Sequence, residues 1–265
     1  MKIGVVTLFP KAFDYILDAK KSGLVGETLS SGKNFFLEDL RDFGEGRHKV
    51  VDAPPYGGSD GMIFKPEPLE RAFESLADKM HVDLDKAYKV YLDPKGKSWT
   101  QKQAESLIYR DQEGQKKGEE LSLILLCGRY GGVDQRFLDI YINESISLGR
   151  FILNGGELPA LCLLESLVRI MPKTLKNSDS VEYDSFSCGL SGGLEPKLYT
   201  RPQTWKDLEV PSILLSGHHE NIEKNRRMES LKLTESWFER EMQDLVAHFE
   251  RFKEYIREHE SEDEG

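Results

Sequence analysis

Apolar runs recur along the first 153 residues of the chain and predict buried strands. Their sequences are KIGVVTLF (2–9), AYKVYLDP (87–94), LSLILLCG (121–128) and SISLGRFIL (145–153). Short continuous apolar runs are typical of strands that are covered on both faces of a sheet. Segments of helical character, such as LERAFESLADKM (69–80), lie between them. This alternation predicts an α/β fold with a largely parallel sheet.

Three of the predicted strands end in residues that favour turns. VYL is followed by DPKG, LLC by GRYGG, and FIL by NGGELPA. The last of these turns leads into a predicted helix, ELPALCLLESLVRI (157–170), with Pro159 in its first turn. Open α/β sheets bind their ligands at the carboxyl ends of the strands. We therefore expect the three turns to meet at one edge of the sheet and to form a ligand crevice there.

Hydrophobic periodicity disappears from Lys173 to about Gln203, where Ser, Gly and acidic residues dominate. Segments this long are usually either disordered or functional. Beyond them, residues 221–256 are mostly helix formers with apolar positions three and four residues apart. The predicted organisation is one domain at 1–172, an interdomain linker at 173–203, a small helical domain at 204–257 and an acidic tail at 258–265.

Composition narrows the class of protein. The chain has 265 residues, of which 38% are hydrophobic, enough for a core and for one or two domains. Its start, MKIGVVTLFP, lacks the long apolar stretch and the cleavage site of a signal peptide, so we expect a cytoplasmic protein with no membrane segment. Cys127, Cys162 and Cys188 share no CxxC spacing, and we expect free thiols rather than a metal site or a disulfide framework.

The formal net charge of −10 argues against a generally basic nucleic-acid-binding protein. Part of this charge is local, because residues 257–265 hold one Arg against five carboxylates, a net −4. Basic clusters remain at GRHKV (46–50) and EKNRRMESLK (223–232), although a solvated surface is the simpler interpretation of each. The acidic total therefore leaves room for an RNA-binding face.

The glycine turns match neither of the common nucleotide motifs. The chain has no GxxxxGK[ST] phosphate loop and no GxGxxG between an early strand and a helix. Glycine turns without cationic partners suit a ligand that is bound through backbone hydrogen bonds and close packing. S-adenosylmethionine is such a ligand, although simple turn geometry explains any one of these glycine pairs equally well.

Four longer segments together carry a resemblance to a known family. They are RHKVVDAPPYGGSDGM (47–62), CGRYGGVDQR (127–136), SLGRFILNGGELPA (147–160) and YDSF (183–186). In this order they resemble the bacterial tRNA (guanine-N1)-methyltransferases of the SPOUT superfamily, and the match continues from MKIGVVTLFP through YTRP to LLSGHHENIEKNRR. The resemblance implies a trefoil knot in the first domain and an obligate homodimer. It also implies transfer of methyl from S-adenosylmethionine to N1 of the guanosine immediately 3′ of the anticodon, position 37.

The resemblance assigns cofactor and catalytic roles to particular residues. Asp184 becomes the general base and Arg169 the stabilising cation, whereas by default a loop aspartate is solvated and Arg169 would cap its helix. The residues implied to hold the cofactor come from the three turns. They are Tyr91, Leu92, Asp93, Gly128, Tyr130, Gly132, Leu148, Gly149, Arg150, Phe151, Ile152, Leu153, Gly155, Gly156 and Pro159.

The same resemblance assigns tRNA binding to a loop of the first domain and to the second domain of the partner subunit. The implied RNA-binding residues are His48, Asp52, Gly57, Gly58, Gly61, Lys224, Arg226 and Arg227.

The chain departs from the family pattern in three segments. The family turn has glutamate at the position of Gly131, PGM is replaced by DGM with Asp60, and acid and serine are replaced by Arg150 and Asn154. In the family that glutamate lies near the methionine arm and the magnesium chemistry. Gly131 therefore leaves magnesium dependence open, and no metal ligand is assigned.

Two other functions stay open at the level of sequence. A catalytically weak RNA-binding relative would keep the knot and the cofactor pocket but would have lost efficient methyl transfer. An NAD-dependent oxidoreductase on a similar sheet is disfavoured, because the dinucleotide fingerprint is absent.

Overall fold

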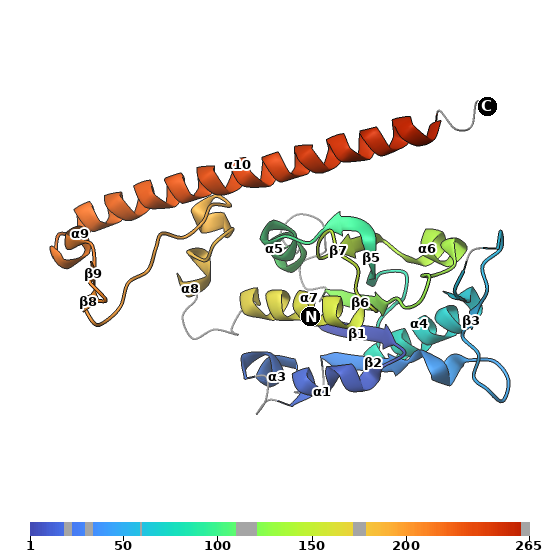
Figure 1. Ribbon diagram of the computed structural model, residues 1–265. Coiled ribbons are helices and arrows are strands. Elements are labelled where there is room, and N and C mark those ends of the chain that lie inside the picture. Colours follow the sequence, from blue (N-terminus) through green and yellow to red (C-terminus); the bar gives the residue numbers. More distant parts are fainter. Residues whose placement is uncertain (19–22, 30–33, 59, 110–120, 172–178, 261–265) are drawn as a thin grey trace. The chain divides into compact units, whose positions relative to one another are not determined.

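The computed structural model describes residues 1–18, 23–29, 34–58, 60–109, 121–171 and 179–260 (Figure 1). The chain divides into two compact units, Met1–Ser178 and Asp179–Gly265.

Unit 1 is built on a five-stranded sheet with the strand order β2-β1-β6-β5-β7, in which all neighbouring strands run parallel. The strands are β1 (Lys2–Thr7), β2 (Phe35–Asp39), β5 (Tyr88–Ser98), β6 (Ser122–Cys127) and β7 (Glu144–Ser147). The predicted α/β class with a largely parallel sheet is confirmed, and β1, β5 and β6 fall on the predicted apolar runs. The edge strand β2 was not predicted, because FFLED is short and ends in two acidic residues.

The predicted strand at 145–153 is wrong beyond Ser147. The Ser147 hydroxyl accepts a hydrogen bond from the backbone N–H of Gly149 at 3.2 Å, and it contacts the Gly149 carbonyl oxygen at 3.1 Å. This side-chain turn ends the ladder, because such bonds offer the backbone an alternative to strand pairing. The apolar residues that follow are not in the core, and Ile152 is 80% exposed.

Helices cover both faces of the sheet (Figure 1). On one face α4 (Pro66–Met80) packs on β1 and β2, and α6 (Gln135–Tyr141) packs on α4. On the other face α7 (Glu157–Ile170) contacts β6, with α3 (Leu24–Leu29) and α5 (Gln101–Tyr109) beside it. The short helices η1 (Pro10–Phe13), α1 (Asp14–Leu17) and η2 (Leu40–Phe43) complete the connections. The predicted helix at 157–170 has the predicted bounds, and the one at 69–80 begins three residues earlier at Pro66.

The core under α4 shows why this helix forms. Its buried residues recur three and four positions apart, which places them on one side of the helix. Phe73 is fully buried and packs edge-on against Phe137 of α6, with ring centroids 5.1 Å apart. At Gly4 the helix comes so close to β1 that an added Cβ would lie 2.6 Å from the Met80 sulfur. Gly4 therefore allows a direct helix-on-strand contact.

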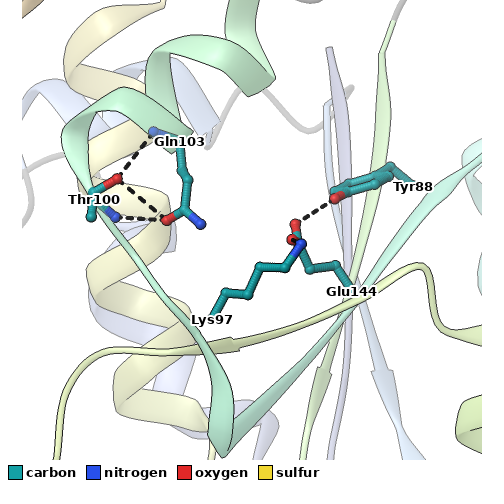
Figure 2. A network of polar contacts seen from close by, with 5 residues as sticks. All are labelled: Tyr88, Lys97, Thr100, Gln103 and Glu144. Atoms are coloured by element: carbon teal, nitrogen blue, oxygen red, sulfur yellow. Dashed lines mark hydrogen bonds and ion pairs between the residues drawn. The ribbon is translucent and has the colours of Figure 1, made fainter.

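The strand β5 leaves its partner β7 and returns to it. Both Leu92 and Lys97 pair with Ile146, so the four residues between them bulge out of the ladder. The Glu144 carboxylate holds the two flanks, accepting a hydrogen bond from the Tyr88 hydroxyl at 2.6 Å and from the Lys97 ammonium at 2.8 Å (Figure 2). The bulge is thus fixed on both sides.

The helix α5 starts immediately after this bulged strand. The Thr100 backbone N–H donates to the Gln103 side-chain oxygen at 2.9 Å, and the Gln103 backbone N–H donates to the Thr100 hydroxyl at 3.3 Å (Figure 2). These reciprocal bonds form a capping box, which satisfies N–H groups at a helix start. The chain therefore turns from β5 into α5 at a defined residue.

A two-stranded hairpin, β3 (Asp52–Ala53) with β4 (Ile63–Phe64), stands apart from the main sheet in unit 1. In the described part of the chain no helix is both long and apolar enough to cross a membrane.

Unit 2 is dominated by one long helix, α10 (His219–Glu260). Before it come α8 (Asp179–Glu182), η4 (Cys188–Leu190), the hairpin of β8 (Thr204–Trp205) with β9 (Leu208–Glu209), and α9 (Ser212–Leu215). The first residues of the predicted linker, 173–178, lie outside the described residues, as do the last residues of the predicted acidic tail, 261–265. The tail was predicted to begin at 258, but α10 continues to Glu260.

We expect Gly96→Ala to destabilise the fold, because an added Cβ would lie 2.5 Å from the backbone nitrogen of Ile146. A backbone neighbour in a sheet cannot rotate away, so overpacking should lower the free energy of unfolding by about 1–3 kcal/mol. Urea denaturation monitored by circular dichroism measures this change. Lys95→Ala, which trims a neighbouring exposed side chain of the same bulge, is the control. Equal stability of the two variants would contradict the close contact at Gly96.

Candidate active site

A cavity of about 390 Å³ lies in unit 1 at the ends of β6 and β7 and at the bulge of β5. Its walls are the bulge after Leu92, the glycine turn after Cys127 and the loop from Ile146 to Gly156. The structure thus brings together the three turns that the sequence placed at one sheet edge. All the residues predicted to hold the cofactor line this cavity except Arg150, whose side chain is exposed and does not line it.

The glycines allow the main chain of these walls to approach closely. The Gly156 N–H donates to the Gly128 carbonyl at 2.9 Å, and an added Cβ on Gly156 would lie 2.7 Å from Cys127 Cα. An added Cβ on Gly128 would lie 2.8 Å from the Tyr91 ring. The end of β6 therefore touches both the start of α7 and the end of β5. Any side chain at Gly128 or Gly156 would push these walls apart.

An ion pair between the buried Glu157 and Arg129 joins the glycine turn to the start of α7 beside the cavity. The Glu157 side chain is 4% exposed, and its two oxygens accept hydrogen bonds from the Thr7 hydroxyl at 2.7 Å and from Arg129 Nε at 3.0 Å. Arg129 also donates to the Asn154 carbonyl at 3.1 Å, and its guanidinium lies 4.3 Å from the centroid of the Phe9 ring. A buried carboxylate needs such partners, because its desolvation is otherwise costly.

Sequence analysis missed this cluster. Arg129 and Glu157 lie inside the quoted CGRYGG and GGELP motifs, but they are 28 residues apart, and Thr7 is 150 residues from Glu157. The only signal in the sequence is that Arg129 and Glu157 each lie inside one of the quoted motifs. The sequence separations between Thr7, Arg129 and Glu157 do not indicate that these residues are in contact.

Burial keeps two titratable groups in this region neutral: Tyr91, which lines the cavity, and Cys127, which precedes the glycine turn. Burial raises the pKa of the Tyr91 hydroxyl, and the nearby Asp93 carboxylate raises it further. Burial also raises the pKa of the Cys127 thiol well above its usual range, with a smaller contribution from Glu157. Tyr91 therefore remains a protonated phenol near neutral pH, and Cys127 is not a thiolate nucleophile.

The two cations that line the cavity are not placed to bind phosphate. Arg129 is paired with Glu157, and the Lys95 side chain is 87% exposed and lies 3.7 Å from the Asp93 carboxylate. The remaining lining is mostly glycine backbone together with leucine, isoleucine, valine, proline and aromatic side chains, with polar groups from Asp93, Gln135, Ser147 and Asn154. Such a cavity suits a ligand with an apolar ring and no phosphate groups.

The hairpin that precedes α4 is bonded directly to the glycine turn. The Gly131 N–H donates to the Met62 carbonyl at 2.8 Å, the Phe64 N–H to the Gly132 carbonyl at 3.0 Å, and the Asp134 N–H to the Phe64 carbonyl at 3.1 Å. Backbone hydrogen bonds therefore join one wall of the cavity to the loop that the resemblance assigns to RNA.

The structure shows how the RNA-assigned residues of unit 1 are presented. His48 is exposed in the turn between Gly46 and Lys49, and Asp52 begins β3. The three loop glycines have positive φ and open space around them; they are Gly57 (φ 90°), Gly58 (φ 79°) and Gly61 (φ 99°). Tyr56, which the sequence analysis did not select, is fully exposed at the loop tip.

The glycine turn itself is tight at two positions. Tyr130 has φ 57° and Gly132 has φ 118°, both in the region that favours glycine. Gly131 is not among the positive-φ residues, and an added Cβ there would lie 3.0 Å from the Met62 carbonyl oxygen. The backbone at Gly131 therefore accepts an L-residue with a small adjustment of the neighbouring chain.

In unit 2, Asp184 lies half-buried in a loop that is tied to itself and to α10. The Phe186 N–H donates to the Gly193 carbonyl at 2.6 Å, and the Phe186 ring packs edge-on against Trp237 with centroids 5.1 Å apart. Arg169 is exposed in the last turn of α7, in unit 1. The two predicted catalytic residues therefore belong to different units, and their catalytic roles stay predictions.

A second, larger hollow of about 920 Å³ lies within unit 2, beside the Asp184 loop. Lys224, Arg226 and Arg227 line it from the start of α10, facing Tyr183 and Leu190 of the loop region. Carboxylates from Glu195, Glu220 and Glu223 also line it. The three predicted RNA-binding cations thus share one concave surface of mixed charge.

Among the described residues, no group of three or more His, Cys, Asp or Glu side chains is placed to hold a metal ion. Cys127 is a buried free thiol, and Cys162 and Cys188 are exposed free thiols.

Comparison with known proteins identifies a family that covers most of the chain. The family described as tRNA (guanine-1)-methyltransferase TrmD matches residues 1–246. A tRNA (guanine-N(1)-)-methyltransferase of Cereibacter sphaeroides is 44% identical over 232 residues, which are 87% of this chain and 86% of the relative. Proteins of the same name from Alkaliphilus oremlandii, 39% identical over 244 residues (88% and 89%), and from Pseudoalteromonas translucida, 41% identical over 239 residues (90% and 86%), are similar. The chain therefore belongs to the tRNA (guanine-1)-methyltransferase TrmD family.

Proposed function

We propose that this protein transfers a methyl group from S-adenosylmethionine to N1 of a guanine in tRNA, at the guanosine immediately 3′ of the anticodon. Family membership supports the reaction class, because the relatives carry the name tRNA (guanine-N(1)-)-methyltransferase. The observation that carries the proposal is the cavity at the ends of β6 and β7 and at the bulge of β5, which is lined mostly by glycine backbone and apolar side chains and in which the partly buried Arg129 is already paired with Glu157.

The residues of this cavity fit S-adenosylmethionine. A volume of about 390 Å³ is within the range of small-molecule sites, roughly 300–1,000 Å³. Apolar residues such as Ile146, Leu148 and Leu153 would cover the adenine, while backbone groups near Leu92 and Gly128 would hydrogen-bond its edge. The nearly buried Asp93 carboxylate could accept hydrogen bonds from the ribose or from the amino group of the methionine arm. When bound, the sulfonium supplies an electrophilic methyl group to the nucleophilic nitrogen.

Residues of the chain would supply the proton chemistry. Guanine N1 carries a proton that must leave as the new N–CH₃ bond forms, and negative charge builds on O6 as it leaves. The Asp184 carboxylate would accept the N1 proton, and the Arg169 guanidinium would stabilise O6. The loop that holds Asp184 is anchored by Phe186 on Trp237 and by the Leu194 N–H, which donates to the Thr234 hydroxyl at 2.9 Å. Such anchoring favours a carboxylate of fixed position.

The proposal includes an assembly. As in the family it resembles, the chain would be a cytoplasmic homodimer with a trefoil knot in unit 1, and Asp184 would act beside the cofactor site of the partner subunit. Unit 2 would serve as the helical tRNA-binding domain, with Lys224, Arg226 and Arg227 on the tRNA backbone. The loop with His48, Asp52 and the three glycines would approach the anticodon arm. A positively charged face on an acidic protein is compatible with this role.

Magnesium is proposed only as a conditional activator. Where the family has glutamate, Gly131 offers no carboxylate, and Asp93 is the acidic side chain on the cavity wall. Oxygen ligands are what Mg²⁺ requires, so fewer carboxylates should mean weaker dependence on this ion.

Methylation of unmodified tRNA by the purified protein, with labelled S-adenosylmethionine, tests the proposed function. We expect stoichiometric label in 1-methylguanosine, and no label in a tRNA with adenosine at the target position. Cofactor binding without methyl transfer would instead support a catalytically weak RNA-binding relative. Label that persists in the adenosine control would overturn the assigned position.

Asp184→Asn should separate chemistry from binding. The amide keeps the shape of the side chain but cannot accept the N1 proton, so single-turnover methylation should fall about 10²-fold or more. Cofactor affinity measured by calorimetry should change by a few-fold at most. The control is Glu182→Gln, an equally isosteric change of an exposed carboxylate on the preceding helix, which should retain activity. An equal collapse of cofactor binding in Asp184→Asn would reassign Asp184 to a structural role.

Gly131→Glu should strengthen the stimulation of methyl transfer by magnesium, because it restores a carboxylate that could ligate a hard cation. The backbone at Gly131 tolerates the change, since its φ is not positive and the added Cβ would be 3.0 Å from the Met62 carbonyl oxygen. Magnesium titrations of tRNA methylation compare this variant with the native protein and with Gly131→Gln, which has the same size and no charge. A strong and equal magnesium requirement in all three proteins would refute a role for a carboxylate at this position.

A further inference from the structure

The second half of α10 carries an apolar seam, defined here as Phe238, Met242, Leu245, Phe249, Phe252 and Ile256. These side chains are between 37% and 65% exposed. They are spaced alternately four and three residues apart, which is the a/d pattern of a coiled coil. An exposed apolar surface of this length marks an interaction site on a protein in water. The last three members lie beyond residue 246, where the family match ends.

The first half of α10 has a different task. Its Thr234 hydroxyl and Trp237 ring hold the loop that carries Asp184, and the seam begins at the next residue, Phe238. Glu235 occupies the position at which the heptad pattern would continue toward the start of the helix. Phe238 packs edge-on against Trp237, with ring centroids 4.9 Å apart, whereas the other five seam residues continue along α10 beyond this contact. The seam is long enough for about three heptads of contact with another helix.

We propose that the α10 seam pairs with the same seam of a second copy of this chain, with the two helices antiparallel. In this arrangement Leu245 faces Phe249 of the partner subunit, Met242 faces Phe252 of the partner subunit, and Phe238 faces Ile256 of the partner subunit. Each helix supplies the same six residues, so the contact is self-complementary and closes as a two-fold pair.

Charges beside the seam select the antiparallel direction. Phe238, Leu245 and Phe252 occupy the d positions of the heptad. The residues that follow them, Glu239, Val246 and Lys253, occupy the e positions. An antiparallel pair places Glu239 next to Lys253 of the partner subunit, twice by symmetry, and brings the two Val246 side chains together. A parallel pair would instead place His248 next to Lys253 of the partner subunit and would form no pair of opposite charge over this region.

This inference goes beyond the proposed function and does not depend on it. The seam could be occupied by a surface of unit 1 instead, from the same chain or from its partner. That alternative predicts contacts between α10 and unit 1 and none between two copies of α10, so the two arrangements can be distinguished chemically.

Cross-linking of the full-length protein tests the pairing. In a background of Cys162→Ser and Cys188→Ser, we compare Val246→Cys with Lys253→Cys, which occupy the same heptad position. In the antiparallel pair Val246 lies opposite residue 248 of the partner subunit, so the two copies of residue 246 are about 3 Å apart along the helix axis, at about 1.5 Å per residue. Lys253 lies opposite residue 241 of the partner subunit, so the two copies of residue 253 are about 18 Å apart along the axis. A short bis-maleimide should therefore give a covalent dimer with Val246→Cys and leave Lys253→Cys monomeric on a denaturing gel.

Two additional variants show whether the seam drives this cross-link. Leu245→Asp puts a charge into the seam and should abolish the dimer band, whereas Ala247→Asp puts the same charge on the opposite side of α10 and should preserve it. Equal cross-linking of Val246→Cys and Lys253→Cys would overturn the antiparallel direction. Absence of cross-linking from Val246→Cys would overturn self-pairing.

Discussion

Glu157 brings a carboxylate into the interior of unit 1, and the way this charge is satisfied organises the candidate site. Glu157 is the first residue of α7, and its carboxylate binds Thr7 at the end of β1 and Arg129 in the glycine turn. Removing one partner from a buried ion pair leaves an uncompensated charge, at a typical cost of about 3–5 kcal/mol. The pair therefore holds a strand end, a turn and a helix start together, and this contact fixes the positions of the cavity walls.

The same pair determines what the cavity can bind. Arg129 is engaged by Glu157, and burial keeps Tyr91 and Cys127 neutral, so the charged side chains that the cavity lining offers to a ligand are those of Asp93 and Lys95. Specificity must then come from backbone groups and from the shape of the loop between Ile146 and Gly156. A ligand is selected here by fit, by hydrogen bonding and by the Asp93 carboxylate on the cavity wall.

Local patterns in the sequence were sufficient for three strands of the sheet and for the edge at which the cavity forms. Apolar runs identified β1, β5 and β6, and the Gly-Gly-Glu-Leu-Pro segment identified the start of α7. The bulge of β5 was not predictable, because it depends on Glu144, which contacts Tyr88 and Lys97 from another strand. The strand expected through Leu153 failed for a local reason, since a single serine hydroxyl ends the ladder at Ser147. Motif resemblance supplied Asp184 and Arg169, which no spacing rule could have connected.

The three hydrogen bonds between the β3–β4 hairpin and the glycine turn all run from main chain to main chain. Such bonds do not depend on which side chains the two segments carry. The wall they build can therefore keep its shape while its chemistry is substituted, and Gly131 is an instance of such a change. A substitution at Gly131 would therefore change the chemistry of this wall and leave its contour in place.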